Sequence, residues 1–207
     1  MQTINNDFPF HHSSTAILQA SADNAFSYLD DPKRLSSHMS ESSWMMAGSK
    51  MAIELDEKVG HGIGAEIVLR GKMLGIPLFV REAVTDWQPA KRQAWETVGP
   101  QKMIIIGQYR MGFDLIPRAS GVALRVFIDY GFPESASGRI LGKIFAKIYA
   151  KWCTGRMAKD AAKHFNEMAR ISGAQPMGEK LSLSMGEEAS PASTEDKLER
   201  FPSREGL

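Results

Sequence analysis

The sequence predicts an α+β fold in which a curved antiparallel sheet of about seven strands wraps around a long C-terminal helix, with two short helices after the first strand. Three observations favour this fold. Apolar residues alternate with polar ones through several short segments, and they recur at helical spacing only near the two ends of the folded part. The strand-like segments follow one another without intervening helices, which indicates an antiparallel meander. A sheet with one apolar face and one long helix can bury their apolar surfaces against each other.

The N-terminal part of the chain is predicted to form a strand followed by two short helices. Residues 12–20 alternate loosely between apolar and polar side chains, which indicates the first strand. Ser21 is suited to cap the first helix, because its side-chain oxygen can accept a hydrogen bond from a backbone N–H of the first turn. Asp31 precedes Pro32, and proline fits the first position of a helix, so a second short helix is expected to continue to Met39.

Six further strands are predicted where apolar residues recur at every second position. They are expected at residues 51–55, 65–70, 78–87, 93–98, 108–116 and 122–132. Glycine and proline separate these segments, as short turns require. The alternation is clearest in the last two strands, so we expect one face of the sheet to be buried and the other to contact water.

A long helix is predicted between Pro133 and Ile171, where the helical period returns. One face of its first half carries large apolar side chains, which are Leu141, Ile144, Phe145, Ile148, Tyr149 and Trp152. We expect this face to lie inward and the basic face opposite it to be exposed. After Gly155 the apolar residues point in a different direction, so we expect a kink near Thr154 and Gly155, where glycine weakens the helix.

Composition and charge predict one folded domain with an acidic tail. The 207 residues include 43% hydrophobic and 24% charged residues, as in soluble globular proteins, and carry a net charge of +1. From Ser172 onward the chain is rich in Ser, Glu, Pro and Gly and has a net charge of −3, so the preceding part carries +4. We therefore expect a folded domain over residues 1–171 and a disordered tail over residues 172–207.

Several classes of function find no support in the sequence. The near-zero net charge gives no reason to expect a nucleic-acid partner, and no apolar stretch is long enough to span a bilayer. The five histidines lack the spacing of a metal site, so neither a metal nor a cofactor is expected. The glycines of residues 60–64 are interpreted as a turn. A single cysteine, Cys153, and the lack of a secretory signal in residues 1–10 favour the cytoplasm.

Glu82 is the candidate polar residue of the buried face. Because Val80 and Val84 are expected to point inward, the alternation of the strand carries Glu82 inward with them. A buried carboxylate needs a partner or a raised pKa. One interpretation is structural. Arg70 would form an ion pair with Glu82, although strand parity places Arg70 on the solvent-exposed face, or a bulge would return Glu82 to solvent. The other is a polar anchor for a ligand.

Five local patterns, taken in order, indicate a known superfamily. They are the segment AFSYLDDP at Ala25–Pro32, the turn at Gly71–Gly75, the segment Glu82–Pro89 followed by Trp95–Thr97, the segment Tyr109–Phe113, and Tyr149–Cys153 in the last helix. Over about residues 11–170 the chain thereby resembles the helix-grip superfamily of START domains, polyketide cyclases and the major birch pollen allergen, often abbreviated SRPBCC. The resemblance implies a cavity between sheet and helix that holds a lipid, sterol, polyketide or other hydrophobic molecule. Only some members are enzymes, and no shared catalytic motif can be carried over.

Candidate cavity residues follow from this resemblance together with the inward strand faces. They are His38, Trp44, Met46, Glu82, Tyr109, Met111, Phe113 and Trp152. Each of the apolar ones is equally explained by core packing. Catalytic residues stay unknown, and the expected function is a carrier or sensor of a hydrophobic small molecule.

Two alternatives remain open. A cyclase- or dehydratase-type enzyme would use Glu82 with Tyr109 or His38 as acid and base in the same cavity. A membrane-surface adaptor would use the basic face of the last helix, whose side chains are Arg139, Lys143, Lys147 and Lys151. Anionic lipid headgroups attract such a row, although a solvated helix face explains it as well.

Overall fold

The computed structural model describes residues 8–35, 51–57, 60–73 and 76–173. Its elements are β1 (Phe10–Leu18), α1 (Ala22–Leu29), α2 (Pro32–Leu35), β2 (Met51–Leu55), β3 (Glu66–Met73), β4 (Ile76–Gln88), β5 (Arg92–Thr97), β6 (Tyr109–Arg118), β7 (Gly121–Tyr130) and α4 (Ala136–Ile171). The seven strands form one antiparallel sheet in the order β1-β7-β6-β5-β4-β3-β2. The predicted α+β architecture is confirmed. The expected tail lies almost entirely outside the described residues.

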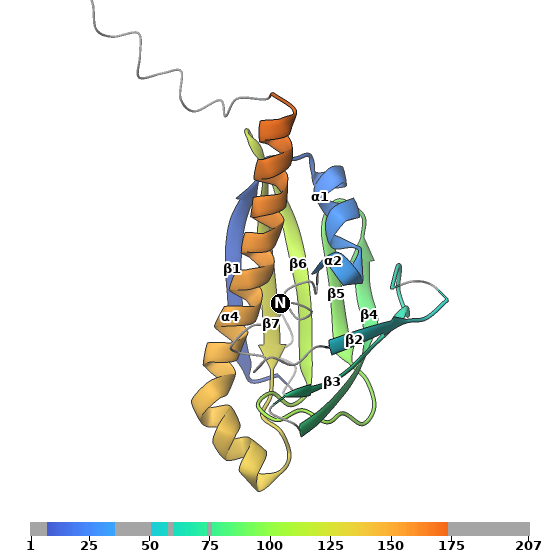
Figure 1. The fold of residues 1–207 in the computed structure, drawn as a ribbon, viewed down its shortest axis with the longest axis vertical. Coiled ribbons are helices and arrows are strands. Elements are labelled where there is room, and N and C mark those ends of the chain that lie inside the picture. The colour runs from blue at the N-terminus through green and yellow to red at the C-terminus, as the bar shows by residue number, and fades with distance from the viewer. Residues whose placement is uncertain (1–7, 36–50, 58–59, 74–75, 174–207) are drawn as a thin grey trace, which may run out of the picture. The chain divides into compact units, whose positions relative to one another are not determined.

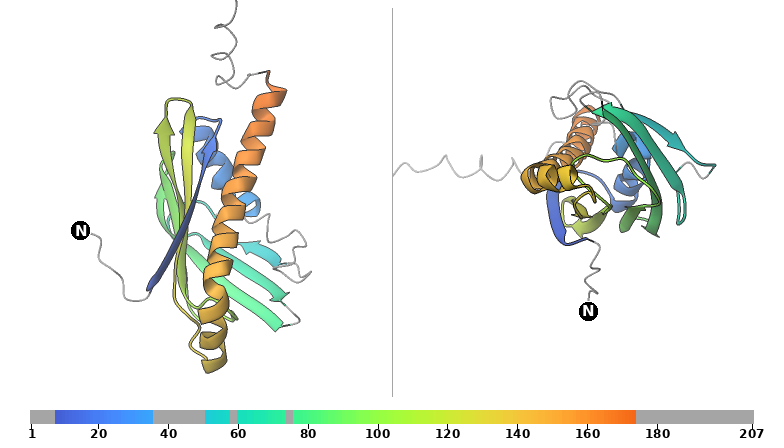
Figure 2. Two further views of the ribbon diagram at one scale, coloured as in Figure 1. Left: turned by 90° about the vertical axis from the view of Figure 1, so that its left-hand side faces the viewer. Right: turned by 90° about the horizontal axis from the view of Figure 1, so that it is seen from below.

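The sheet curves around the helices, which lie on its inner face (Figures 1 and 2). Helix α4 packs against β1 and β7 at one edge, and the α1–α2 pair covers a neighbouring part of the same face (Figure 1). Between them the inner face carries the core, which includes Phe113, Leu124 and Val126, all fully buried. The outer face is more polar. Charged side chains can cover its apolar residues, as Arg92 does: its guanidinium lies 4.8 Å from the ring centre of buried Phe127.

The two short helices begin where the sequence predicts. The Ser21 hydroxyl accepts a hydrogen bond from the backbone N–H of Asn24 at 3.2 Å and caps α1. Pro32 is the first residue of α2. The described part of α2 ends at Leu35, so its expected continuation to Met39 lies outside the described residues.

Helix α4 contacts the sheet mainly through small residues, and the prediction for its first half is only partly correct. Its buried residues are Gly138, Gly142, Ala146, Ala150, Cys153, Thr154, Met157, Ala158, Ala161 and Phe165. Of the large apolar residues expected to lie inward, Leu141, Tyr149 and Trp152 are half-buried, but Ile144, Phe145 and Ile148 are exposed, with 56% of Ile144 and 52% of Ile148 accessible. Small residues let the helix axis approach the sheet closely, and a stripe of isoleucines in their place would hold it away.

Helix α4 is one continuous helix of 36 residues, so the chain does not break near Thr154 and Gly155. Small residues of its first half, such as Gly142 and Ala146, are already buried. The hydroxyl of Thr154 donates to the carbonyl of Ala150 at 2.9 Å within the helix. No helix in the described residues is long and apolar enough to cross a membrane.

Two glycines of α4 provide a matched test of how closely the helix packs on its surroundings. A Cβ atom added to Gly142 would lie 2.9 Å from the carbonyl oxygen of Ile105, whereas one added to Gly155 would meet nothing closer than the Ser14 hydroxyl at 3.7 Å. Alanine favours a helix over glycine by about 0.5–1 kcal/mol. We therefore expect Gly155→Ala to stabilise the protein by that amount. We expect Gly142→Ala to destabilise it by about 1 kcal/mol, because overpacking outweighs the gain.

Urea denaturation of both variants and of the wild type measures the two free energies of unfolding. The close packing of Gly142 against Phe132 and the backbone of Ile105 would be contradicted if the two substitutions stabilised the protein equally.

Candidate functional site

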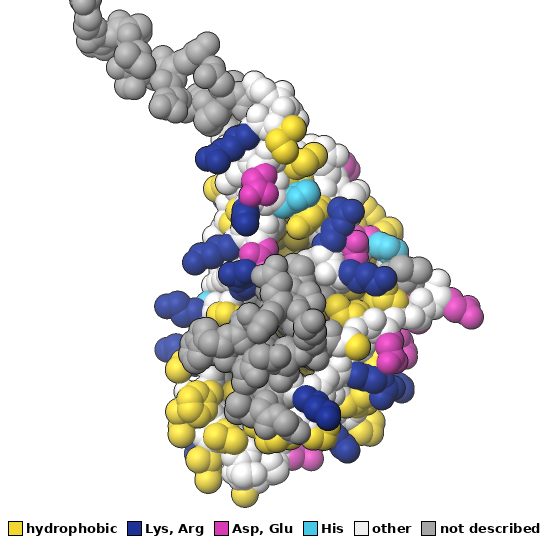
Figure 3. All heavy atoms as spheres, viewed as in Figure 1, with side chains coloured by type: hydrophobic (Ala, Val, Ile, Leu, Met, Phe, Trp, Pro, Cys, Tyr) yellow, Lys and Arg dark blue, Asp and Glu magenta, His cyan; other side chains and the backbone are white. Residues whose placement is uncertain are grey.

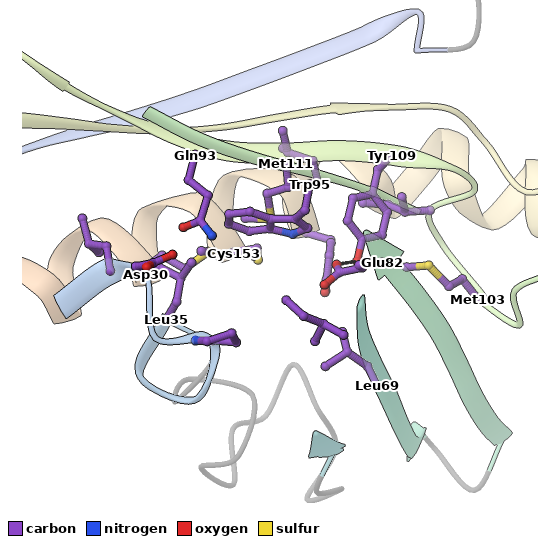
Figure 4. A pocket seen from close by; sticks show the side chains of 17 residues that line it. Asp30, Leu35, Leu69, Glu82, Gln93, Trp95, Met103, Tyr109, Met111 and Cys153 are labelled. Atoms are coloured by element: carbon purple, nitrogen blue, oxygen red, sulfur yellow. Dashed lines mark hydrogen bonds between the residues drawn. The ribbon is translucent and has the colours of Figure 1, made fainter. Parts of the chain in front are cut away.

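A pocket lies between the inner face of the sheet, helices α1 and α2, and the middle of α4 (Figure 4). Its lining consists of Leu29, Asp30, Pro32, Leu35, Ile67, Leu69, Glu82, Gln93, Trp95, Met103, Ile106, Tyr109, Met111, Ile128, Tyr149, Cys153 and Met157. The enclosed volume is about 60 Å³, and about 680 Å³ is free of atoms when the open mouth is included. The lining is mainly apolar, with a few polar groups set into it, as is common for small-molecule sites.

Glu82 faces into this pocket, as its strand parity predicts, and only 5% of it is exposed. The Tyr109 hydroxyl donates a hydrogen bond to its Oε1 atom, which Figure 4 shows as a dashed line. Burial raises the pKa of Glu82 to about 7, and hydrogen bonds from Tyr109 and Trp95 offset part of this shift. The carboxyl group therefore titrates near neutral pH.

Arg70 is not the partner of Glu82, so the ion-pair interpretation is wrong. Its guanidinium Nε donates to Oε2 of Glu54 at 3.2 Å, and both of these side chains are exposed. Strand parity places Arg70 on the outer face, and the structure leaves it there. The bulge in β4 falls between Val84 and Asp86, after Glu82, and does not turn the carboxyl group out to solvent.

Three further titratable groups of the pocket are held in their neutral forms. Burial raises the pKa of the Tyr109 and Tyr149 hydroxyls well above the usual range of tyrosine, and it raises the pKa of the Cys153 thiol to about 12. A thiol that stays protonated is a poor nucleophile. Cys153 thus has the properties of a buried structural cysteine.

A second polar cluster lies at the Asp30 end of the pocket. The Asp30 carboxylate accepts a hydrogen bond from Nε1 of Trp87 at 3.1 Å, and His61 Nδ1 lies 2.7 Å from its other oxygen. His61 stands in the predicted glycine turn, where Gly60 and Gly62 both have positive φ. This turn brings the imidazole to the end of α1.

Gln93 lies on β5 and is buried, with 3% exposed. Its side-chain oxygen is one of two buried polar side-chain atoms in the described residues that have no hydrogen-bond partner. Figure 4 shows Gln93 and Glu82 on opposite sides of Trp95. Gln93, Asp30 and Tyr149 were not predicted as site residues, although Gln93 shares the inward parity of Trp95 two positions along the strand.

The predicted candidate residues divide into three groups. Glu82, Tyr109 and Met111 line the pocket, and their role in binding stays a prediction. Phe113 is not part of the lining, because α1 covers that end of β6 and the ring of Phe26 packs on it at 5.7 Å. Trp152 is half-buried outside the lining and contacts Tyr149.

The third group, His38, Trp44 and Met46, lies outside the described residues. The basic side chains of α4, which are Arg139, Lys143, Lys147 and Lys151, are exposed and contribute nothing to the pocket. In the described part of the chain, no group of three or more His, Cys, Asp or Glu side chains could hold a metal ion.

Comparison with known proteins establishes the fold. No family model matches the sequence, and no curated protein matches it either. Among solved structures, the Zhui aromatase/cyclase from Streptomyces has a TM-score of 0.60 at 13% identity, over 80% of this chain and 99% of that one. Ara h 8.0201 has a TM-score of 0.53 at 12% identity, over 76% of this chain and 98% of that one.

Norcoclaurine synthase from Thalictrum flavum, solved in complex with dopamine and hydroxybenzaldehyde, has a TM-score of 0.52 at 14% identity, over 76% of this chain and 86% of that one. All three have the helix-grip fold, and the present chain shares it. At these identities the likeness extends to the fold alone.

The raised pKa of Glu82 predicts a specific dependence of stability on pH. The folded protein holds this proton up to about pH 7, whereas an unfolded chain releases it near 4.5. The free energy of unfolding is therefore expected to fall as the pH rises between these values and to level off above them, with a contribution of about 3 kcal/mol from this one group. Urea denaturation across this range should show the fall in the wild type.

The variant Glu82→Gln should lose this component, and Glu54→Gln, which changes an exposed carboxylate of the same sheet, should keep it. Equal pH profiles for wild type and Glu82→Gln would contradict the buried position of the carboxyl group.

Proposed function

We propose that this protein binds a hydrophobic small molecule, such as a lipid, sterol or polyketide-like compound, in the pocket between the sheet and α4, as a carrier or a sensor. The observation that carries the proposal is an apolar pocket with a buried carboxyl group for which the described residues supply no cation. A purely structural carboxylate at such depth is expected to have an ion-pair partner. The small aromatic ligands of norcoclaurine synthase, which shares the fold, support the same assignment.

The side chains of the pocket suit a ligand larger than the enclosed volume. An enclosed space of about 60 Å³ holds a few water molecules, so a drug-sized ligand has to extend into the mouth or displace side chains. Met103, Met111 and Met157 all line the pocket. Methionine is unbranched and flexible, so these residues can change rotamer at low cost and shape the space to the ligand.

The first test is to recover the ligand. Native mass spectrometry of protein purified from cells, followed by organic extraction, should show a co-purifying apolar compound. Met111→Trp fills the pocket and should lose that compound. Ile116→Trp, on the exposed side of the same strand, should retain it. If wild type and both variants carry no compound, and the empty wild type binds no apolar probe, the proposal is wrong.

A second candidate is an acid–base enzyme, and the geometry of Glu82 and Tyr109 favours it. A carboxyl group that titrates near pH 7 can both donate and accept a proton under ordinary conditions. The Tyr109 hydroxyl bonds to Oε1 and fixes the orientation of the group. Such a pair is suited to the proton transfers of a cyclase or dehydratase reaction.

The extracted compound distinguishes the carrier from the enzyme. In D₂O, an enzyme of this type should exchange an acidic C–H of the compound or convert it to a product, and Glu82→Gln should do neither. A carrier leaves the compound unchanged with either protein.

The outer surface of α4 supports an additional role at anionic membranes. Ile140, Ile144 and Ile148 form an exposed row at four-residue spacing, and Lys147 and Lys151 run beside it. Figure 3 shows hydrophobic side chains gathered over the N-terminal half of α4, with basic side chains along the helix beyond them. Exposed apolar residues flanked by lysines are typical of helices that lie in the plane of a membrane surface, where each basic residue contributes about 1 kcal/mol.

Flotation with phosphatidylcholine vesicles, with and without phosphatidylglycerol, tests this role. The wild type should float only with the anionic lipid. The double variant Ile144→Ser, Ile148→Ser should not float. Ile171→Ser, which changes an even more exposed isoleucine at the far end of α4, should float like the wild type. Binding that ignores the anionic lipid, or that survives the double substitution, would exclude this role.

A further inference from the structure

The described lining of the pocket contains two carboxyl groups and no basic side chain. Asp30 and Glu82 both face it, and its described lining contains no lysine, arginine or histidine. A carboxylate ligand would therefore lose its hydration beside two acidic groups and gain no cation in return. The pocket is therefore expected to bind uncharged apolar ligands more tightly than fatty acids and other anions.

The other polar hydrogens of the lining already have acceptors inside the protein. The Tyr109 hydroxyl donates to Glu82, and the Trp95 indole is also hydrogen-bonded to this carboxyl group. The Tyr149 hydroxyl is hydrogen-bonded to Cys153. These groups offer little to a ligand without giving up an existing bond.

Gln93 is different, because its buried side-chain oxygen has no partner among the described residues. A buried acceptor without a hydrogen bond is costly, and a ligand that donates to it removes that cost. The same amide carries N–H groups that can donate. A ligand hydroxyl group can donate the hydrogen bond that this oxygen lacks.

The register of the sheet gives the distance between Gln93 and Glu82. Gln93 is paired with Trp87 and Phe113, and Glu82 is paired with Thr97, four residues further along β5. At ~3.3 Å per residue, the two polar positions lie about 13 Å apart along the strand. Trp95 and Met111 are paired across the middle of this interval and provide an apolar surface between its ends.

We infer that the pocket selects an uncharged apolar molecule that carries a hydroxyl group, with this hydroxyl bound to the side-chain amide of Gln93, and that it rejects the corresponding carboxylates. The inference rests on the proposed function, since it specifies the ligand class of the same pocket. Phenols and long-chain or polycyclic alcohols belong to this class.

Three matched probes test the selection. They are naphthol, methoxynaphthalene and naphthoate, all substituted at the same ring carbon, and displacement of Nile red fluorescence measures their affinities. Naphthol should bind the wild type about tenfold more tightly than its methyl ether, which cannot donate a hydrogen bond. Naphthoate at pH 8 should bind more weakly than either.

Substitution of Gln93 tests whether its side-chain amide causes the preference for naphthol. Gln93→Met keeps the length of the side chain and removes the amide, so naphthol should lose its advantage while the ether binds as before. Gln88→Met changes an exposed glutamine of β4 and should retain the wild-type preference.

The outcomes separate the two proposals. If naphthol and its ether bind the wild type equally, or if naphthoate binds best, the hydroxyl selection is wrong while ligand binding stands. The hydroxyl selection is also wrong if Gln93→Met folds and keeps the full preference for naphthol over its ether. If the wild type binds none of the three probes and carries no extractable compound, the proposed function fails, and the inference fails with it. The wild-type comparison decides the question even if Gln93→Met does not fold.

Discussion

The close contact between α4 and the edge of the sheet is the constraint on which the rest of the domain depends. Buried small residues such as Ala146 and Ala150 bring the helix onto β1 and β7, where larger side chains would hold it away. Because the helix is seated at this edge, it covers the inner face only in part. Strands β3 to β6 are left to be covered by α1, α2 and the segment around Met103, and the pocket lies beneath them. The same contact turns Ile144 and Ile148 outward.

A second consequence concerns the polar groups of the pocket. Helix α4 contributes Tyr149, Cys153 and Met157 to the lining, and its lysines all point to the other side. The helix therefore brings no cation to Glu82, and β4 brings none either, because strand parity places Arg81 on the outer face with Glu66. Among the described residues, the carboxyl group is hydrogen-bonded by Tyr109 and Trp95 and has no cation beside it, so burial raises its pKa to about 7. A carboxyl group without a cation at this depth is less stabilising than an apolar side chain of equal size, which is the trade-off expected at functional sites.

The sequence predicted what depends on local periodicity and missed what depends on distances between elements. Alternation along a strand determines which residues face inward, so Glu82, Tyr109 and Met111 could be placed beforehand. The side of α4 that meets the sheet could not, because a helical wheel groups residues by hydrophobicity, whereas the contact is decided by how closely the backbones approach.

Polar residues of the site were missed for related reasons. Gln93 has the same inward parity as Trp95, but a lone glutamine in a strand gives no sign that its partner is missing until the surrounding structure is known. Asp30 lies in the segment Ala25–Pro32, whose sequence shows no sign of a role in the site, and only the folded structure places it in the pocket lining with Trp87 and His61 bonded to it. Strand parity predicts which face of the sheet a side chain lies on. Whether its hydrogen bonds are satisfied is known only from the folded structure.

The pocket and the exposed isoleucine row are physically linked because one helix carries both. Tyr149 lines the pocket, and its sequence neighbour Ile148 belongs to the outer row. A rigid helix transmits a shift at either side to the other, since its backbone hydrogen bonds hold successive residues in fixed relation. Opening the pocket by moving α4 would break the contact of Ala146 and Ala150 with the sheet, so the cheaper route for a ligand is to displace the methionines and leave α4 in place. An apolar ligand can thus enter without disturbing the surface that would rest on a membrane.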